Sequence, residues 1–363
     1  MNRTIEGRLA DPMGLDEDVT EGLRGICAEK HLKVARFLFN SQTALGTATG
    51  YRTVIRDFKD HCLSSEKLSY DDFGSEEVLS FVIEVAMKKG KAYMAKVKPA
   101  ISKLEVAMDR PSTETSLTPM VEAIVSGGKR VCAEIAPTIK KMDPVPKELV
   151  ILLLQEEVWD KVPHLEDISL QKFRIIFKWV IEICTLCRFN NYVQLQAKHF
   201  TPAKDKNSIE IFFPRSKNDQ FHKGQSKYLD RCKGQIWNPV DITALYFKRF
   251  GFKMDGKDDS YVHCRLRRKG STQIPDPRYK LSYAAAAAES KELLEQHGYG
   301  SLKYGEGSSA KRAGVTAAIH KGVSIDTVQQ CGGWKTNSMP LHYLQNSETH
   351  KVNIAKQMKF ADV

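Results

Sequence analysis

A cluster of side chains that could carry out chemistry stands near the C-terminus, in the stretch GGWKTNSMPLHYLQ. It begins at Gly332 and places Trp334 nine positions before Tyr343, with His342 beside the tyrosine. A tyrosine hydroxyl can act as a nucleophile and form a covalent intermediate when neighbouring groups activate it. A lone tyrosine after an amphipathic segment is more often a packing residue. Cationic partners elsewhere in the chain would therefore decide between the two interpretations.

Three basic residues precede this stretch, each in a recognisable sequence context. Arg188 follows an apolar segment and opens CRFNNYVQL, Lys217 stands in PRSKND between two strand-like runs, and Arg312 lies in SAKRAGVTA. Arginine is planar and permanently charged, so two arginines can hold the oxygens of a phosphate through bidentate hydrogen bonds. Each residue alone is typical of a solvated surface. Only their joint occurrence in the order of a known family would indicate a site.

Together these segments resemble the tyrosine recombinase (phage integrase-type) family, and most closely its eukaryotic mobile-element branch. The resemblance runs from about residue 21 onward. In that family an arginine opens an Arg-x-x-acidic-x-x-x-Leu pattern, a lysine lies on a β-hairpin, and a His-x-x-Arg motif opens a helix. A histidine or tryptophan follows, and the nucleophilic tyrosine comes nine residues later. Carried over to this chain, the site residues are Arg188, Lys217, Ser309, Arg312, Trp334 and Tyr343.

The resemblance implies that Tyr343 attacks a DNA phosphodiester, giving a 3′-phosphotyrosyl link and a free 5′-hydroxyl. The link conserves the bond energy, so we expect no cofactor. Arg188 and Arg312 would stabilise the charge of the transition state. Lys217 would protonate the leaving 5′-oxygen, and Trp334 would donate its indole N–H to a phosphate oxygen.

Two positions depart from the family pattern. Asn191 stands where an acidic residue is usual, and Ser309 stands where a histidine is usual. Serine can hydrogen-bond a phosphate but cannot titrate near neutral pH; His342 or His320 could compensate. Three functions therefore remain open: a site-specific recombinase or transposase, a DNA-binding derivative that cuts weakly or not at all, and a type IB topoisomerase-like enzyme. A separate N-terminal helical domain and a C-terminal tail favour the first over the third.

The charge balance favours a polyanionic partner. Of 363 residues, 55 are Lys or Arg and 44 are Asp or Glu, which gives a net charge of +11 and a pI near 9.1. Such an excess is typical of proteins that bind nucleic acid, and we expect binding to double-stranded DNA to weaken steeply with salt. The run RLRRKG is either a patch that contacts phosphate or directs nuclear import, or a solvated loop. Candidate DNA-contacting residues are Lys96, Lys98, Lys129, Arg130, Lys140, Lys141 and Arg215.

Cysteines and hydropathy argue against several other classes. The eight cysteines are scattered, and only Cys184 and Cys187 form a C-x-x-C, within a segment that reads as a buried helix. We therefore expect no metal site and no disulfide. No run approaches the roughly 18 apolar residues of a membrane span, and the N-terminus lacks the apolar core of a signal peptide. We expect no membrane association and no secretion, and a nuclear location if the source is eukaryotic or a location in the cytoplasm or nucleoid otherwise.

Helical periodicity before a proline- and lysine-rich segment, and mixed elements after it, predict a mainly α protein of two domains. The resemblance implies that the two domains close as a clamp on DNA. Residues 1–20 are predicted as a flexible N-terminus, 21–140 as a helical core DNA-binding domain, 141–147 as a linker and 148–363 as a catalytic domain with a small antiparallel β-sheet. Residues 255–282 are predicted as a loop. The resemblance implies a tetramer on DNA, and the segment after Tyr343 is predicted as a helical tail that docks on a neighbouring protomer.

Overall fold

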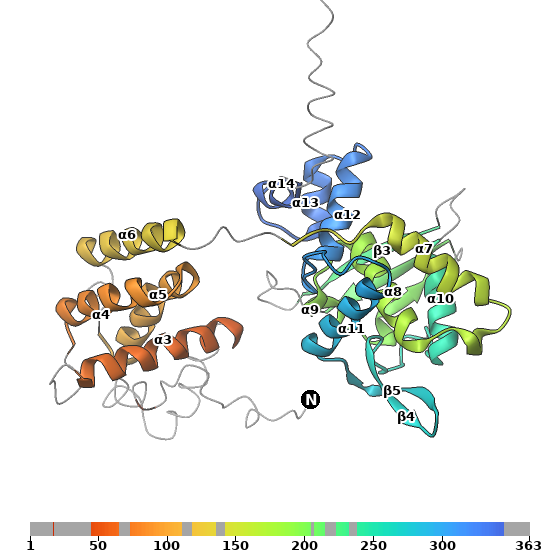
Figure 1. Ribbon diagram of the computed structural model, residues 1–363, viewed down its shortest axis with the longest axis horizontal. Coiled ribbons are helices and arrows are strands. Elements are labelled where there is room, and N and C mark those ends of the chain that lie inside the picture. Colours follow the sequence, from red (N-terminus) through yellow and green to blue (C-terminus); the bar gives the residue numbers. More distant parts are fainter. Residues whose placement is uncertain are drawn as a thin grey trace, which may run out of the picture. The chain divides into compact units, whose positions relative to one another are not determined.

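The computed structural model describes residue 17 and residues 45–64, 73–110, 118–135, 142–204, 207–214, 223–231 and 238–344. The chain divides into two compact units, Met1–Ile139 and Lys140–Val363 (Figure 1). Four of the predicted site or DNA-contacting residues lie outside the described residues, as does the C-terminal tail: Lys140, Lys141, Arg215 and Lys217. None of the described helices is long and apolar enough to cross a membrane.

The described part of unit 1 is helical, as predicted. Its helices pack around one buried apolar cluster that includes Phe58, Phe81 and Ile101. Helix α4 has two glutamates in its first turn and Lys88 in its last, which suits the helix dipole. The elements are α3 (Leu45–Ser64), α4 (Ser75–Lys88), α5 (Lys91–Ala107) and α6 (Pro119–Ile135).

Of the predicted DNA-contacting residues, four lie in unit 1. Lys96 and Lys98 lie on α5, and Lys129 and Arg130 lie on α6. Lys96 and Arg130 are exposed, whereas Lys98 forms an ion pair with Glu122 of α6. Their contact with DNA stays a prediction.

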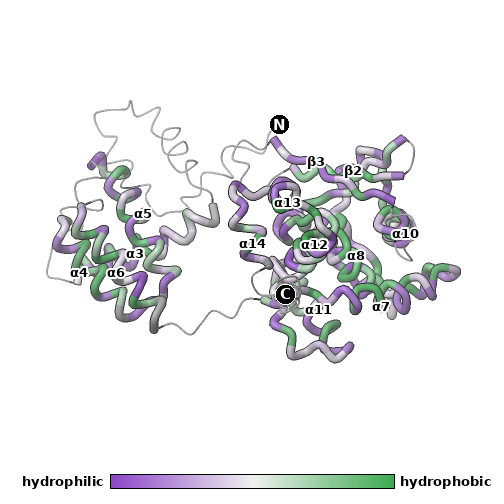
Figure 2. Tube along the Cα trace, turned by 90° about the horizontal axis from the view of Figure 1, so that it is seen from above, coloured by the Kyte–Doolittle hydropathy of each residue, from purple (hydrophilic) through white to green (hydrophobic). Residues whose placement is uncertain are grey.

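Unit 2 is built around helix α8 (Leu170–Thr185), which is apolar along most of its length (Figure 2). Helices α7, α10, α11 and α12 all contact it, so it forms the centre of the unit's core. The helical elements around it are α7 (Lys147–Glu157), η3 (Trp159–Lys161), η4 (Leu165–Asp167), α9 (Phe189–Tyr192), η5 (Ala197–His199), α10 (Pro239–Phe250), α11 (Tyr283–Gln296), α12 (Ser309–His320), α13 (Ile325–Gly332) and α14 (Ser338–Leu344).

A three-stranded antiparallel sheet, ordered β1-β2-β3, completes this core. Its strands are β1 (Phe200–Pro202), β2 (Ser208–Phe213) and β3 (Gln225–Asp230). The predicted alternation along β2 is confirmed, because Ile209, Ile211 and Phe213 are all buried. The predicted second strand is β3, whose Ser226 pairs with Phe212. The short edge strand β1 was not predicted, since three residues carry too little pattern.

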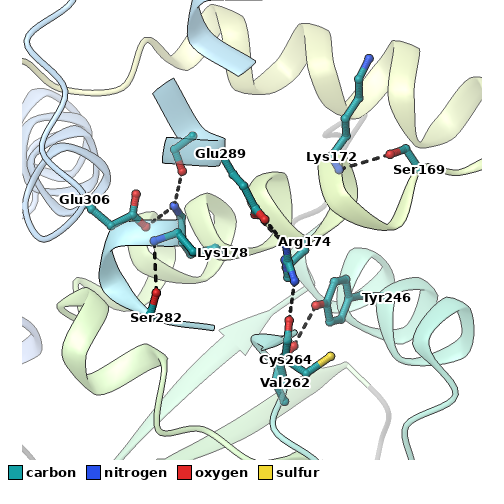
Figure 3. A network of polar contacts seen from close by, with 12 residues as sticks. Ser169, Lys172, Arg174, Lys178, Tyr246, Val262, Cys264, Ser282, Glu289 and Glu306 are labelled. Atoms are coloured by element: carbon teal, nitrogen blue, oxygen red, sulfur yellow. Dashed lines mark hydrogen bonds and ion pairs between the residues drawn. The ribbon is translucent and has the colours of Figure 1, made fainter. Parts of the chain in front are cut away.

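Two cationic side chains of α8 cross the core to distant segments (Figure 3). Arg174 donates to both carboxylate oxygens of Glu289 on α11, at 2.7 and 2.6 Å, and to the carbonyl of Cys264. Lys178 forms a fully buried ion pair with Glu306 and donates to Ser290 Oγ at 2.7 Å. These contacts fix α8 against segments that follow it by 90 residues or more.

The prediction of a loop over residues 255–282 was wrong. The segment contains a two-stranded antiparallel ribbon, β4 (Cys264–Lys269) with β5 (Thr272–Lys280). Gly270 makes the turn at a φ of 63°, a left-handed conformation that glycine adopts without strain. Its high charge concealed the alternation, because the ribbon has few apolar residues to mark a buried face.

Part of the predicted linker belongs to unit 2. The N–H groups of Asp143 and Val145 donate to the carbonyls of Lys303 and Ser309, at 2.9 and 3.2 Å. The side chain of Val145 is buried in the core of that unit. Residues 142–146 are therefore an extended segment of unit 2 that leads into α7.

Candidate functional site

The site lies where α8 ends beside the sheet and the three C-terminal helices. Helix α8 stops at Leu186, which adopts a left-handed conformation with φ 52°, and Arg188 then caps α9. Strand β3 and the C-terminal end of α13 border the same hollow. The hollow is lined by Leu186, Cys187, Arg188, Asn191, Phe213, Gln225, Lys227, Lys311, Gly332 and Gly333.

Three cationic side chains meet in this hollow. Lys227 of β3 donates to the carbonyls of Thr185 and Cys331, both at 2.6 Å, so it ties the sheet to α8 and α13. Lys311 of α12 donates to the carbonyl of Gly332 at 3.1 Å. The guanidinium of Arg188 makes no hydrogen bond or ion pair within the described part of the chain. Three basic side chains, with no described carboxylate lining the hollow, suit the binding of an anion.

Burial among like charges lowers the pKa of both lysines. Burial, followed by the charges of Arg188 and Lys227, lowers the pKa of Lys311 to about 6. The pKa of Lys227 is also lowered, mainly by burial, although Cys187 and Cys331 partly oppose this. A bound anion would favour the charged form of both lysines.

Trp334 packs against Lys311. The ammonium of Lys311 lies 4.0 Å from the centre of the indole ring, a close cation–π contact. The indole is buried, and its Nε1–H has no hydrogen-bond partner among the described residues. Buried donors are rarely left unpaired, so this N–H is available to a ligand.

The double glycine before Trp334 has a steric reason. A Cβ on Gly332 would lie 1.9 Å from Cζ3 of Trp334, far inside van der Waals contact. Gly333 ends α13 in a left-handed conformation with φ 66°, which turns the chain so that the indole lies back over Gly332.

We therefore expect Gly332→Ala to displace the indole and to lower the free energy of unfolding by about 1–3 kcal/mol, as overpacking does. Urea unfolding followed by tryptophan fluorescence measures both effects. Gly127→Ala on α6 is the control, because nothing lies within 4 Å of its added Cβ and alanine favours a helix. Equal behaviour of the two variants would contradict the steric role of Gly332.

Tyr343 packs against Trp334 and is held by Arg312. The two rings lie 5.3 Å apart, within an apolar cluster that includes Val315 and Val328. Arg312 donates through Nη1 to the carbonyl of Tyr343 at 3.0 Å, and its guanidinium lies 5.0 Å from the centre of the tyrosine ring. Arg312 thus contacts the tyrosine helix α14, and it is not among the residues that line the hollow.

The remaining predicted residues fall into different settings. Asn191 lines the hollow, whereas Ser309 is fully buried and its Oγ accepts a hydrogen bond from the N–H of Gly305. Ser309 therefore fixes the start of α12. Lys217 lies outside the described residues, so its role stays a prediction.

Sequence reasoning missed Lys227 and Lys311. Lys311, Val315 and Ala318 follow one another at helical spacing, and the last two pack in the cluster with Trp334. This periodicity could have shown that Lys311 shares the face of α12 that meets Trp334. Lys227 gave no such signal, because strand β3 has lysine among polar neighbours.

Most of the chain is similar in structure to solved DNA recombinases. The XerH site-specific recombinase in a post-cleavage complex with palindromic difH substrate has a TM-score of 0.58 at 16% identity, over 93% of this chain and 87% of that chain. XerH bound to difH in a pre-cleavage complex has a TM-score of 0.51 at 14% identity, over 93% and 88%. The chain has the tyrosine recombinase fold. A Tn1549 transposon integrase in complex with transposon right end DNA also matches, with a TM-score of 0.50, 9% identity and coverage of 94% and 98%.

The tyrosine recombinase fold confirms the predicted fold class, mainly helical with a small antiparallel sheet. No protein-family model matches the sequence, and no curated protein matches it. The eukaryotic mobile-element branch and the closing of the two units as a clamp stay predictions.

Proposed function

We propose that this protein is a site-specific DNA recombinase or transposase that cuts and rejoins DNA through a phosphotyrosyl link to Tyr343. The observation that carries the proposal is the meeting of Arg188, Lys227 and Lys311 in one hollow, with Lys311 against the ring of Trp334 that packs on Tyr343. The likeness in fold to recombinases and an integrase solved with their DNA supports it.

In this proposal the three cations hold the scissile phosphate. Their positive charge stabilises the negative charge that develops on the phosphate oxygens as Tyr343 attacks. The unpaired indole N–H of Trp334 donates to the same group. Arg312 is a positioning residue, since it holds the backbone and the ring of Tyr343. The leaving 5′-oxygen takes its proton from Lys227 of β3 or from Lys217, which stands between β2 and β3 in the sequence.

A second candidate is a DNA-binding derivative that has lost cleavage. One observation favours it: Tyr343 is only 8% exposed, and its ring packs within an apolar cluster. Attack on DNA would require α14 to move. In both cases the partner is duplex DNA. We extend the proposal to a tetramer on two duplexes, acting in the nucleus if the source is eukaryotic and in the cytoplasm or nucleoid otherwise.

Trapping on nicked duplexes tests the proposal. The duplexes should carry inverted repeats found in the DNA that flanks the gene. The nick makes the cleaved strand short enough to diffuse away, and its loss prevents religation. We expect a covalent adduct that resists denaturation with the wild type and no adduct with Tyr343→Phe. Tyr283→Phe, which alters an exposed tyrosine of α11, is the matched control. Binding without any wild-type adduct would establish the derivative instead.

A further inference from the structure

The β4–β5 ribbon is a dense and exposed concentration of positive charge. Between Cys264 and Lys280 it carries six cationic residues and one acidic residue, a net charge of +5 within a chain of net +11. All six cations are exposed: Arg265, Arg267, Arg268, Lys269, Arg278 and Lys280. Like charges this close destabilise one another, which indicates a role outside folding.

Its cations are largely free of protein partners. Arg278 pairs with the only carboxylate of the ribbon, Asp276, at 3.1 Å. Within the described residues Arg265, Arg267 and Lys269 form no ion pair. The ring of Tyr279 lies 5.7 Å from the guanidinium of Arg265, which helps to orient that side chain without neutralising it.

The register places three of these cations on one face. Arg265, Arg267 and Lys269 alternate along β4, so they project to the same side, whereas Leu266 projects to the other side and packs against the core of unit 2. Cations at every second strand position are spaced by about 6.8 Å. Successive phosphates of one DNA strand lie further apart in space than their axial rise of about 3.4 Å, because the backbone winds around the axis, so the row can follow neighbouring phosphates.

The ribbon is fixed firmly at its base, where it leaves the body of unit 2 (Figure 1). Arg174 of α8 donates to the carbonyl of Cys264 at the start of β4. At the other end the N–H of Leu281 donates to the carbonyl of His263 at 2.8 Å. Because the cations are held on a pre-ordered element, binding costs little conformational entropy.

We propose that the β4–β5 ribbon is a DNA-contacting surface outside the cleavage hollow, on which Arg265, Arg267 and Lys269 bind the sugar–phosphate backbone of the duplex. The identity of the polyanion rests on the proposed function. A two-stranded ribbon is narrow enough to enter the major groove. Contacts of this kind contribute affinity and register on the duplex and take no part in strand cleavage.

The test compares two triple variants with the same loss of charge. One is Arg265→Gln/Arg267→Gln/Lys269→Gln, and the control is Lys248→Gln/Lys253→Gln/Lys257→Gln, which removes three exposed lysines elsewhere in unit 2. The dissociation constant for a duplex is measured across salt concentrations. Each lost phosphate contact reduces the magnitude of the slope of log K against log salt by about 0.9. We therefore expect that magnitude to fall by up to about 2.7 in the ribbon variant and by less than about 1 in the control.

Each outcome decides the proposal. An unchanged slope for the ribbon variant, or an equal change in the control, would overturn it and leave the proposed function intact. If the wild type binds DNA without forming a covalent adduct and the ribbon variant shows the expected loss of slope, the ribbon proposal stands and the recombinase proposal fails. Tighter binding to an acidic polypeptide than to duplex DNA would assign the ribbon to a protein partner and overturn it. Matching thermal unfolding of the variants confirms that both remain folded.

Discussion

Replacing Lys178 by methionine should lower the free energy of unfolding by about 3–5 kcal/mol, because it leaves a buried carboxylate without its partner. Both members of the Lys178–Glu306 pair are fully buried. The ammonium also donates to Ser290 Oγ at 2.7 Å and to Tyr304 Oη at 3.2 Å. One turn further along α8, burial raises the pKa of Glu182, and the charge of Lys178 opposes this rise. The variant therefore leaves Glu306 and Glu182 buried without the positive charge of Lys178.

Urea unfolding of unit 2 measures this loss against two comparisons. Lys198→Met breaks the exposed pair with Asp259 and should change stability by less than about 1 kcal/mol. Lys178→Met/Glu306→Leu removes both buried charges and should be more stable than the single variant, since no lone charge remains. A single variant that unfolds like Lys198→Met would show that Glu306 finds another partner or takes up a proton at little cost.

The helices and the main strands could be predicted from the sequence because their patterns are local. The apolar spacing of α8, the alternation along β2 and the glycine after α13 all lie within short windows. The β4–β5 ribbon could not be predicted, since only Cys264 and Leu266 of its residues belong to the core of unit 2. The partners of Arg174 and Lys178 also carried no local signal, because they lie 90 residues or more away.

The positions of some candidate site residues agree with one another in the structure. Arg188 lines the hollow and Trp334 packs against Lys311 beside it, and their catalytic roles stay predictions. Lys311 and Arg312 are consecutive residues of α12, so their side chains point about 100° apart around the helix axis. Both neighbours are basic, and only packing against Trp334 and Tyr343 decides which one faces the hollow.

Lys311→Met should slow formation of the Tyr343 adduct by about 10²–10³-fold, the usual effect of removing one donor that stabilises transition-state charge. This expectation rests on the proposed function. Duplex affinity at neutral pH should change far less, because many phosphate contacts remain. Lys321→Met, at the exposed end of the same helix, is the control and should leave the rate unchanged. Equal rates for Lys311→Met and the wild type would remove Lys311 from the site.

A charge at position 311 that titrates should also make DNA binding depend on pH. The groups that face Lys311 are Arg188 and Lys227, which lower its pKa, and Cys187 and Glu182, which raise it. Burial sets the folded value at about 6, below the ordinary 10.5, so the free protein holds this lysine neutral at pH 8.

Binding of a phosphodiester favours the ammonium form, so the complex takes up a proton above pH 6. Affinity for the duplex should therefore fall as pH rises from 6, by roughly tenfold per unit at most for one proton. Titration calorimetry in buffers of different ionisation enthalpy counts that proton directly. Lys311→Arg keeps the charge at every pH in this range and should abolish the uptake. If the arginine variant takes up the same proton, the titrating group is Lys227, and Lys311 is charged before DNA arrives.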